Sequence, residues 1–279
     1  MPDFLVKLSA PAAGTLGATL LHAILLLPVP ATADIEVFDR WNPTRIEQLQ
    51  RNSPPASAPG ERVEFIAKAF LSTPYVADTL VGSATTPEEF VLRLDGVDCF
   101  TLLDYVEALR RSHDYDGFRT ALREVRYRDG RVDFLARRHF FSDWVGQDSE
   151  WLADVTSRVA GARRTVRSLK QLNRRGDSNL FLPGYPVRER EVVYIPRDMI
   201  DDEVLGRLLS GDYVGIYSEK PGLDVSHCGI LVRRDGHLYL LHASSRQKTR
   251  KVVMEELALY LQGRPGLVVY RTRRPLSQP

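Results

Sequence analysis

Cysteine is scarce in this chain. The 279 residues include two cysteines, three methionines and three tryptophans. Two cysteines form at most one disulfide, so a disulfide-rich scaffold is excluded. No C-x-x-C or H-E-x-x-H motif, the close ligand pairs typical of zinc sites, occurs in the sequence. We therefore expect no metal and no other cofactor.

An excess of charge of one sign is also missing. The sequence has 38 Lys and Arg against 36 Asp and Glu, which gives a net charge of +2. Arginines cluster at 163–167, 174–175 and 271–274, but no aromatic or glycine pattern of an RNA-binding module accompanies them. We expect no nucleic-acid partner. The clusters indicate either a solvated basic surface or a face for a carboxylate-rich ligand.

The chain lacks an apolar run long enough for a comfortable membrane span. Its most apolar stretch, residues 20–27, follows Lys7 and precedes Ala31-Thr32-Ala33, an A-x-A cleavage pattern. We interpret residues 1–33 as an export signal. The mature protein is then expected in the periplasm or cell envelope, with no stable membrane insertion after signal removal.

The secondary-structure pattern changes along the rest of the chain. Residues 34–59 look irregular apart from a short helix near 46–50. Helical periodicity follows at 62–71, 99–111, 116–125 and around 140–145. Strands are then expected at 192–195, 213–217, 228–232, 238–241, 251–253 and 267–270, with helices at 199–209 and 255–261. Helices first and strands later predict an α+β fold in one domain, residues 60–279, with an insertion at about 127–187.

Cys99 begins one of the predicted helices. Asp98 is a good N-cap residue, and apolar residues recur at helical spacing after it. The unpaired backbone N–H groups and the dipole of a helix start favour a thiolate over a thiol. The nearby carboxylates of Asp95, Asp98 and Asp104 oppose this effect, so we expect a histidine partner to supply most of the activation of Cys99.

Two histidines lie on neighbouring predicted strands. Asp235-Gly236 between them signals a hairpin. With a four-residue loop His227 faces residue 242, and with a two-residue turn it faces residue 244; in both registers His227 and His242 share one face. A nucleophilic cysteine needs a general base, and the base needs a group that fixes its tautomer.

We therefore predict that Cys99, His227 and His242 form a catalytic triad. A zinc site built from the same three residues is the alternative. A further alternative is that the two histidines have no catalytic role and either pack in the core or face solvent.

Cys228 directly follows His227. Strand alternation predicts that its side chain points to the opposite face, away from Cys99. We expect Cys228 to act as a small buried hydrophobic residue. A structural disulfide between Cys99 and Cys228 is the alternative.

These motifs resemble those of the NlpC-type cell-wall cysteine hydrolases, and within them the N-acetylmuramoyl-L-alanine amidase-like branch. The segments that carry the resemblance are Asp98-Cys99, Ser226-His227-Cys228-Gly229-Ile230 and Leu241-His242-Ala243-Ser244-Ser245. The amidase-like segments are Gly96-Val97-Asp98-Cys99-Phe100-Thr101, Arg138-His139-Phe140-Phe141-Ser142-Asp143-Trp144 and Leu223-Asp224-Val225-Ser226-His227.

The resemblance implies a papain-like core with N-terminal helices, a C-terminal antiparallel sheet and an added, mainly helical lobe. It implies peptidoglycan fragments (muropeptides) as the binding partner. Cys99 would attack the amide carbonyl, His227 would act as base and then acid, and His242 would orient His227. The order of the motifs, cysteine before histidine, does not fit the permuted acyltransferases of the superfamily.

The resemblance also suggests further substrate-binding or oxyanion residues. These are Tyr75, in the segment Thr73-Pro74-Tyr75-Val76, together with Asp98, Ser226, Arg138 and His139. The aromatic residues after His139 could line a sugar or peptide cleft. A packing role for Tyr75, and a surface helix packed by its aromatics around residue 140, are the alternatives.

One departure favours the amidase-like branch. In many endopeptidases of this type the cysteine is followed by Ser-Gly, whereas here Phe100 and Thr101 follow it. We expect cleavage between N-acetylmuramic acid and L-alanine. A stem-peptide endopeptidase cutting after D-glutamate, and a catalytically silent peptidoglycan-binding module with Cys99 and Cys228 joined, are the alternatives.

Overall fold

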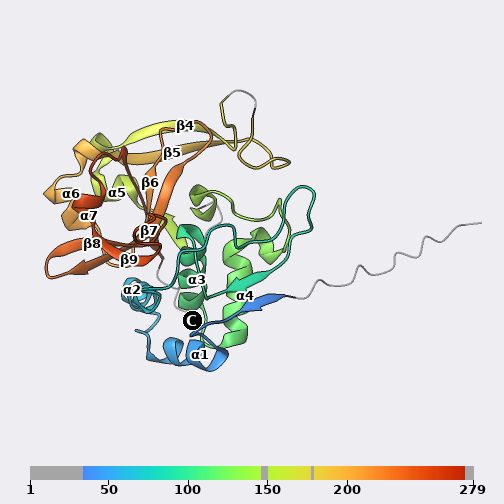
Figure 1. Cartoon of the computed structure of the whole chain (residues 1–279). Coiled ribbons are helices and arrows are strands. Elements are labelled where there is room, and N and C mark those ends of the chain that lie inside the picture. Colours follow the sequence, from blue (N-terminus) through green and yellow to red (C-terminus); the bar gives the residue numbers. More distant parts are fainter. Residues whose placement is uncertain (1–33, 146–149, 177–178, 274–279) are drawn as a thin grey trace, which may run out of the picture. The chain divides into compact units, whose positions relative to one another are not determined.

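The second half of the chain forms a large antiparallel sheet (Figure 1). The computed structural model describes residues 34–145, 150–176 and 179–273. Within these ranges the eight-stranded sheet has the order β4-β5-β10-β6-β7-β8-β9, with β3 paired to β10. Its strands are β3 (Leu152–Asp154), β4 (Val166–Leu172), β5 (Arg188–Pro196), β6 (Tyr213–Tyr217), β7 (Val225–Arg234), β8 (His237–Ser244), β9 (Lys251–Glu256) and β10 (Gly266–Thr272).

Helices dominate the first half. The α-helices are α1 (Pro43–Asn52), α2 (Pro59–Ala69), α3 (Cys99–Arg111), α4 (Tyr115–Arg126), α5 (Thr156–Ala160), α6 (Asp202–Arg207) and α7 (Leu257–Tyr260). Short 3₁₀ turns are η1 (Arg128–Gly130), η2 (Phe141–Val145), η3 (Ala162–Arg164) and η4 (Arg197–Met199). Strands β1 (Ile35–Val37) and β2 (Val91–Arg93) form a separate parallel pair.

Helix α3 is the central helix of this half. It lies against α2 and α4 and against strands β7 and β8 (Figure 1). Every residue from Thr101 to Arg110 is buried, as expected of a helix covered on all sides. Its buried Glu107 accepts hydrogen bonds from Arg110 and from the hydroxyl of Tyr213 on β6, the latter at 2.8 Å. These bonds fix the helix on the sheet and thereby fix the position of Cys99.

The sheet has an apolar core on each face. Along β6, Tyr213 and Tyr217 pack with α3 and its neighbours, whereas Val214 and Ile216 pack with residues of α5, α6 and α7. All five residues of β6 are buried, which is typical of a central strand covered on both faces. The sheet therefore separates the helices of the first half from the shorter helices of the second half.

Most predicted elements are confirmed. Helix α3 and strand β6 have the predicted bounds, and the other expected strands are present with longer ends. The hairpin turns at Asp235-Gly236 and pairs Arg234 with His237, which is the two-residue alternative. The expected α+β order of helices before a largely antiparallel sheet is present.

Two expectations about organisation are wrong. Residues 34–59 are not irregular, because they contain β1 and the ten-residue helix α1. The added lobe at 127–187 is not mainly helical: β3 and β4 from this segment join the large sheet, and its helices are short. Strand β4 is an edge strand with five of its seven residues outside the core, so its sequence lacks a hydrophobic period.

Three predicted helices are shorter or different. The helix expected at 199–209 covers Asp202–Arg207, where Asp201 caps it by accepting a hydrogen bond from Val204 N. The helix expected at 255–261 is reduced to α7, because β9 continues to Glu256. The segment around residue 140 is the 3₁₀ turn η2.

The proposed export signal, residues 1–33, lies outside the described residues. Residues 33–279 cluster as one compact unit. In the part of the chain that the structure describes, no helix is long and apolar enough to cross a membrane.

Candidate active site

Cys99 is the first residue of α3 and is partly exposed. Asp98 is the N-cap: its Oδ1 accepts hydrogen bonds from Phe100 N at 2.9 Å and from Thr101 N at 2.7 Å. The Thr101 hydroxyl returns a bond to Asp98 N at 3.0 Å and completes a capping box. The side chain of Asp98 thus holds the helix start and leaves the N–H of Cys99 as the remaining donor of the first turn.

His227 and His242 form a hydrogen-bonded pair. His227 Nε2 lies 2.8 Å from His242 Nδ1, with the two rings nearly perpendicular. Since Nε2 is used in this bond, Nδ1 of His227 is the ring nitrogen left for the Cys99 sulfur, whose pKa His227 lowers; both residues line one cavity. The predicted juxtaposition of Cys99, His227 and His242 is therefore present.

Glycine at position 229 allows the two histidines to approach. A Cβ atom on Gly229 would lie 2.7 Å from the Leu241 carbonyl oxygen and 3.0 Å from His242 Cβ. A larger residue would push β7 away from β8 at the point where the imidazoles meet.

Cys228 also reaches Cys99, contrary to the prediction that it points away. Its thiol donates to the Cys99 carbonyl oxygen at 3.3 Å, and Cys228 contributes to the lowered pKa of the Cys99 sulfur. Strand alternation is obeyed, because Cys228 packs in the core shared with α3. The prediction placed Cys99 on the His227 face of β7 alone. In the structure Cys99 lies at a helix start that residues from both faces of β7 reach. Both cysteines are free thiols.

The surroundings of Cys99 favour its thiolate. The hydrogen bond from Cys228, followed by the hydrogen bond and charge of His227, lowers the pKa of Cys99 well below its usual range, against the opposing effect of burial. Burial and the neighbouring Cys99 raise the pKa of Cys228 well above its usual range. Cys228 therefore remains the protonated donor while Cys99 carries the charge. The expectation that histidine supplies most of the activation is corrected to a share between His227 and Cys228.

His242 remains neutral. Burial, and then the charges of His227 and Arg246, lower the pKa of His242 to about 3. Its ring packs edge-on against Tyr260 of α7. A neutral imidazole that accepts at Nδ1 carries its proton on Nε2, so His242 is suited to accept from a protonated His227.

Tyr75 lies beside the segment that leads into Cys99. Its backbone pairs with Val97, two residues from Cys99, and its ring is covered by the guanidinium of Arg250. Burial, and then the charges of Cys99 and Asp98, raise the pKa of Tyr75. The raised pKa keeps the Tyr75 hydroxyl protonated, so that it can act as a hydrogen-bond donor.

A cavity of about 240 Å³ opens beside Cys99 and His227. Its wall is mainly aromatic and aliphatic; the lining includes Phe100, His139, Phe140, Phe141, Phe181, Leu182, Leu223, Asp224 and Ser226. Trp144, predicted with the other aromatics as cleft lining, is instead fully buried. The aromatic segment that begins at His139 therefore contributes to the cavity in part.

His139 forms part of the wall as a neutral ring. Its Nε2 lies 2.8 Å from the Phe134 carbonyl oxygen, and burial lowers the pKa of His139 to about 4. Tyr185 packs edge-on against the imidazole. These contacts orient the ring as an uncharged part of the cavity wall.

The other two predicted contact residues differ in position. Ser226 is exposed and lines the cavity. Arg138 does not line it: its guanidinium donates to the carbonyl oxygens of Glu124, Val125 and Tyr127, at the end of α4. The structure gives Arg138 a role in closing that helix end, because the last carbonyl groups of a helix lack partners.

Asp224 is a site residue that the sequence reasoning did not single out. It is buried, and its carboxylate accepts from Ser142 N and Val225 N, both at 2.7 Å. These bonds tie the aromatic segment to the start of β7. The signal was available, because both partners lie in segments that resemble the amidase-like branch.

The contact between the two histidines does not fit a tetrahedral zinc site. Two imidazole nitrogens bound to one tetrahedral zinc ion at about 2.0 Å each lie about 3.3 Å apart. His227 Nε2 and His242 Nδ1 lie 2.8 Å apart, which is a hydrogen-bond distance. Within residues 34–145, 150–176 and 179–273, no three His, Cys, Asp or Glu side chains are grouped so that they could hold a metal ion.

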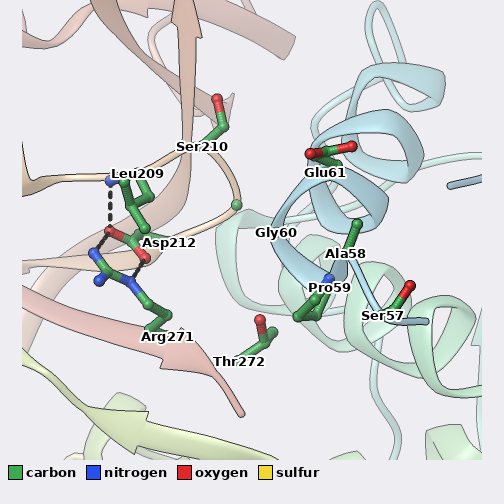
Figure 2. Close-up of a pocket in the computed structure, with 11 residues that line it drawn as sticks. Ser57, Ala58, Pro59, Gly60, Glu61, Leu209, Ser210, Asp212, Arg271 and Thr272 are labelled. Atoms are coloured by element: carbon green, nitrogen blue, oxygen red, sulfur yellow. Dashed lines mark hydrogen bonds and ion pairs between the residues drawn. The ribbon is translucent and has the colours of Figure 1, made fainter. Parts of the chain in front are cut away.

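A larger hollow, of about 580 Å³, lies elsewhere between α2 and the start of β6 (Figure 2). Figure 2 shows that its main charged contact is the pair of Asp212 and Arg271, joined at 2.6 and 2.7 Å. Neither a histidine nor a cysteine lines it. The cavity at Cys99 is therefore the candidate active site despite its smaller volume.

Three solved structures resemble this chain. The chain is similar to an N-acetylmuramoyl-L-alanine amidase from Bacteroides uniformis, with 29% identity and a TM-score of 0.66 over 77% of this chain and 99% of that chain. A proposed xylanase from Bacteroides fragilis matches with 30% identity and a TM-score of 0.61, over 74% and 98% of the two chains. A Legionella pneumophila protein, 19% identical, shares the fold with a TM-score of 0.67, over 82% of this chain and 94% of that chain.

The comparison with curated proteins gives no match. The model of one family matches residues 65–267, which include Cys99 and both histidines. The chain belongs to the N-acetylmuramoyl-L-alanine amidase-like family.

Proposed function

We propose that this protein hydrolyses the amide bond between N-acetylmuramic acid and L-alanine in peptidoglycan fragments, with Cys99 as the nucleophile. The observation that carries the proposal is the contact chain from Cys99 to His227 and from His227 to His242 at the edge of a cavity. The family supplies the class of bond. A cysteine at a helix start with histidines on strands supports an NlpC-type, papain-like core.

In the first step the Cys99 thiolate attacks the lactyl carbonyl carbon, and the carbonyl electrons move to oxygen. The N–H of Cys99 and the hydroxyl of Tyr75 are the donors available for this oxyanion. His227, protonated and held by His242, then gives its proton to the L-alanine nitrogen while the C–N bond breaks. The products of this step are the free peptide amine and a thioester on Cys99.

In the second step water cleaves the thioester. His227, now neutral, takes a proton from the attacking water, and the Cys99 sulfur leaves as thiolate. The lactyl carboxylate is released, and the dyad returns to its starting charge. No group outside the chain is needed beyond water.

The helix cap supports amide cleavage at the sugar over cleavage within the stem. Asp98 Oδ1 accepts three hydrogen bonds within the first helical turn, from Phe100 N, Thr101 N and the Thr101 hydroxyl. These bonds fix the carboxylate against the helix start, and they leave Oδ2 as the Asp98 oxygen available to the free amine of an N-terminal L-alanine. Phe100 adds an apolar wall where a serine would offer a hydroxyl.

The cavity does not suit glycoside hydrolysis, the activity named for the Bacteroides fragilis relative. Most glycosidases use two carboxyl groups that flank the bond to be cut. Among the described lining residues Asp224 is the one carboxylate, and two backbone N–H groups occupy it. The thiol and imidazole pair favours acyl transfer.

Export is part of the proposal, because residues 31–33 form a cleavage pattern. Expression of the full chain in a bacterial host should give a periplasmic product that begins at Asp34. N-terminal sequencing of that product tests the statement, and a cytoplasmic product that retains Met1 would contradict it.

Mass spectrometry of N-acetylmuramyl-tetrapeptide incubated with the protein tests the reaction. Each tube contains a chelator, and the Cys99→Ala variant is the control. We expect free tetrapeptide from the wild type and none from the variant. Release of a dipeptide would place the cut within the stem, and equal activity of the variant would remove Cys99 from the mechanism.

A further inference from the structure

A second, smaller cavity lies on the far side of His227. Its volume is about 160 Å³, and it is lined by Ser226, His227, His242, Ser244, Ser245, Arg246, Tyr260 and Arg264. Ser226 and His227 also line the aromatic cavity. The two cavities therefore adjoin at the base of the proposed reaction.

Two buried polar atoms in this lining have no partner. His242 Nε2 and Ser244 Oγ make no hydrogen bond to any described residue, although both residues are 1% exposed. The nearest carboxylate oxygen to His242 Nε2, Glu255 Oε2, is 3.8 Å away, beyond hydrogen-bond distance. A buried donor without a partner raises the free energy of the folded protein. A ligand with a hydrogen-bond acceptor in this cavity would give both atoms a partner.

The charges of the lining favour an anion. Arg246 and Arg264 both lie over the Tyr260 ring, each with its guanidinium carbon 5.4 Å from the ring centroid. Glu255 neutralises Arg246 through two hydrogen bonds, at 2.9 and 3.0 Å. Arg264 has no carboxylate partner among the residues that the structure describes. Arg264 thus adds a positive charge without a carboxylate partner to the cavity that the two unpartnered donors also line.

We propose that this cavity is a carboxylate subsite for the leaving peptide, in which Ser244, Arg264 and His242 Nε2–H bind the free carboxylate of the second stem residue. The assignment rests on the proposed amidase reaction. His227 must reach the nitrogen of the leaving L-alanine, so the peptide leaves on the side of His227. The next residue of the stem, a γ-linked D-glutamate, carries its free α-carboxylate one peptide unit further along.

The subsite would couple recognition to the reaction. A carboxylate that accepts from His242 Nε2–H holds this tautomer and leaves Nδ1 as the acceptor for His227. The substrate itself would then complete the chain of contacts that ends at Cys99. A substrate without the carboxylate would lose both the Arg264 contact and this orientation.

Two substrates that differ by one group test the proposal: N-acetylmuramyl-L-alanyl-D-glutamate and its D-isoglutamine analogue, in which an amide replaces the carboxylate. For the full chain we expect kcat/KM to be about tenfold or more higher for the acid, because charge-assisted bonds to buried donors are lost with the amide. In Arg264→Gln and Ser244→Ala the ratio of acid to amide should fall toward one. Arg234→Gln, an exposed arginine at the hairpin tip, is the matched control and should keep the wild-type ratio.

Calorimetric binding of the same two compounds to Cys99→Ala gives a readout without turnover. We expect the acid to bind at least tenfold more tightly, and the additional Arg264→Gln change to remove that preference. Equal cleavage and equal binding of both compounds would overturn the subsite and leave the amidase proposal standing. Cleavage of neither compound, with the binding preference intact, would contradict the amidase reaction and keep the carboxylate site. An equal loss for both compounds in Ser244→Ala would show a structural role for Ser244 and overturn its assignment.

Discussion

The two faces of strand β7 pack against different parts of the molecule. Residues from both faces influence the sulfur atom of Cys99. On one face Cys228 packs in the core shared with α3. On the other, His227 contacts His242 and the ring of Tyr260. Cys99, at the start of α3, accepts a hydrogen bond from Cys228 at its carbonyl oxygen, and it lines one cavity with His227.

The two cysteines show what this difference produces. Cys228 is buried, and its surroundings raise the pKa of its thiol. Cys99 is partly exposed, and its surroundings lower the pKa. Proximity alone does not decide the thiolate character of a cysteine: the surroundings shift the pKa values of these two neighbouring thiols in opposite directions.

Replacing each cysteine in turn should give the largest contrast. Cys99→Ala should lower kcat by more than about 10⁴-fold, because no other group can form the thioester. Cys228→Ala should retain measurable turnover of N-acetylmuramyl-tetrapeptide under the same conditions. Peptide release followed by mass spectrometry checks both. If Cys228→Ala were as inactive as Cys99→Ala while folded by circular dichroism, the assignment of the nucleophile would be wrong.

The histidine face can be tested through His242. His242→Ala should lower kcat by about 10²- to 10⁴-fold, since the base then lacks the group that fixes its tautomer. His242→Asn keeps a carbonyl acceptor for His227 Nε2 and should recover part of the loss. Steady-state kinetics of the two variants measure the difference, and equal activities in Ala and Asn would argue against an orienting role.

The Cys228 face should show its effect in the pH dependence. The hydrogen bond from Cys228 lowers the pKa of Cys99, so Cys228→Ala should raise that pKa and reduce the thiolate fraction on the acid side. The loss should disappear as the pH rises above the new pKa. Iodoacetamide alkylation rates measured against pH follow the thiolate of Cys99 directly. Cys228→Ser retains an O–H donor and should shift the profile less; an unchanged profile in Cys228→Ala would leave the activation to His227.

Much of the site could be predicted because its parts have local signals. The N-cap at Asp98, the helical spacing after Cys99 and the Asp235-Gly236 turn each depend on a few neighbouring residues, and all three are present as expected. The shared face of His227 and His242 follows from strand periodicity once the turn is known.

The rest depends on packing between distant segments, which no local pattern records. The approach of Cys228 to Cys99 is decided by where α3 rests on the sheet. The unpartnered atoms of His242 and Ser244 become visible once the cavity at Tyr260 is formed. Strand β4 was not predicted, because an exposed edge strand has a polar sequence without a hydrophobic period.

Asp224 joins the aromatic wall of the cavity to strand β7, so a substitution there tests the wall apart from Cys99. Of the substitutions considered, we expect it to have the smallest effect on turnover. Asp224→Ala leaves the N–H groups of Ser142 and Val225 without their acceptor, so the free energy of unfolding should fall by about 2 kcal/mol. The aromatic segment then loses its tie to β7, and KM for muropeptides should rise several-fold while the alkylation rate of Cys99 changes little. Thermal unfolding, steady-state kinetics and alkylation measure the three quantities on one preparation, and Asp224→Asn, which retains one carbonyl oxygen, is the matched control. A fall in the alkylation rate as large as the rise in KM would mean that Asp224 positions Cys99 as well as the cavity wall. The wall and the reactive strand could then not be perturbed separately.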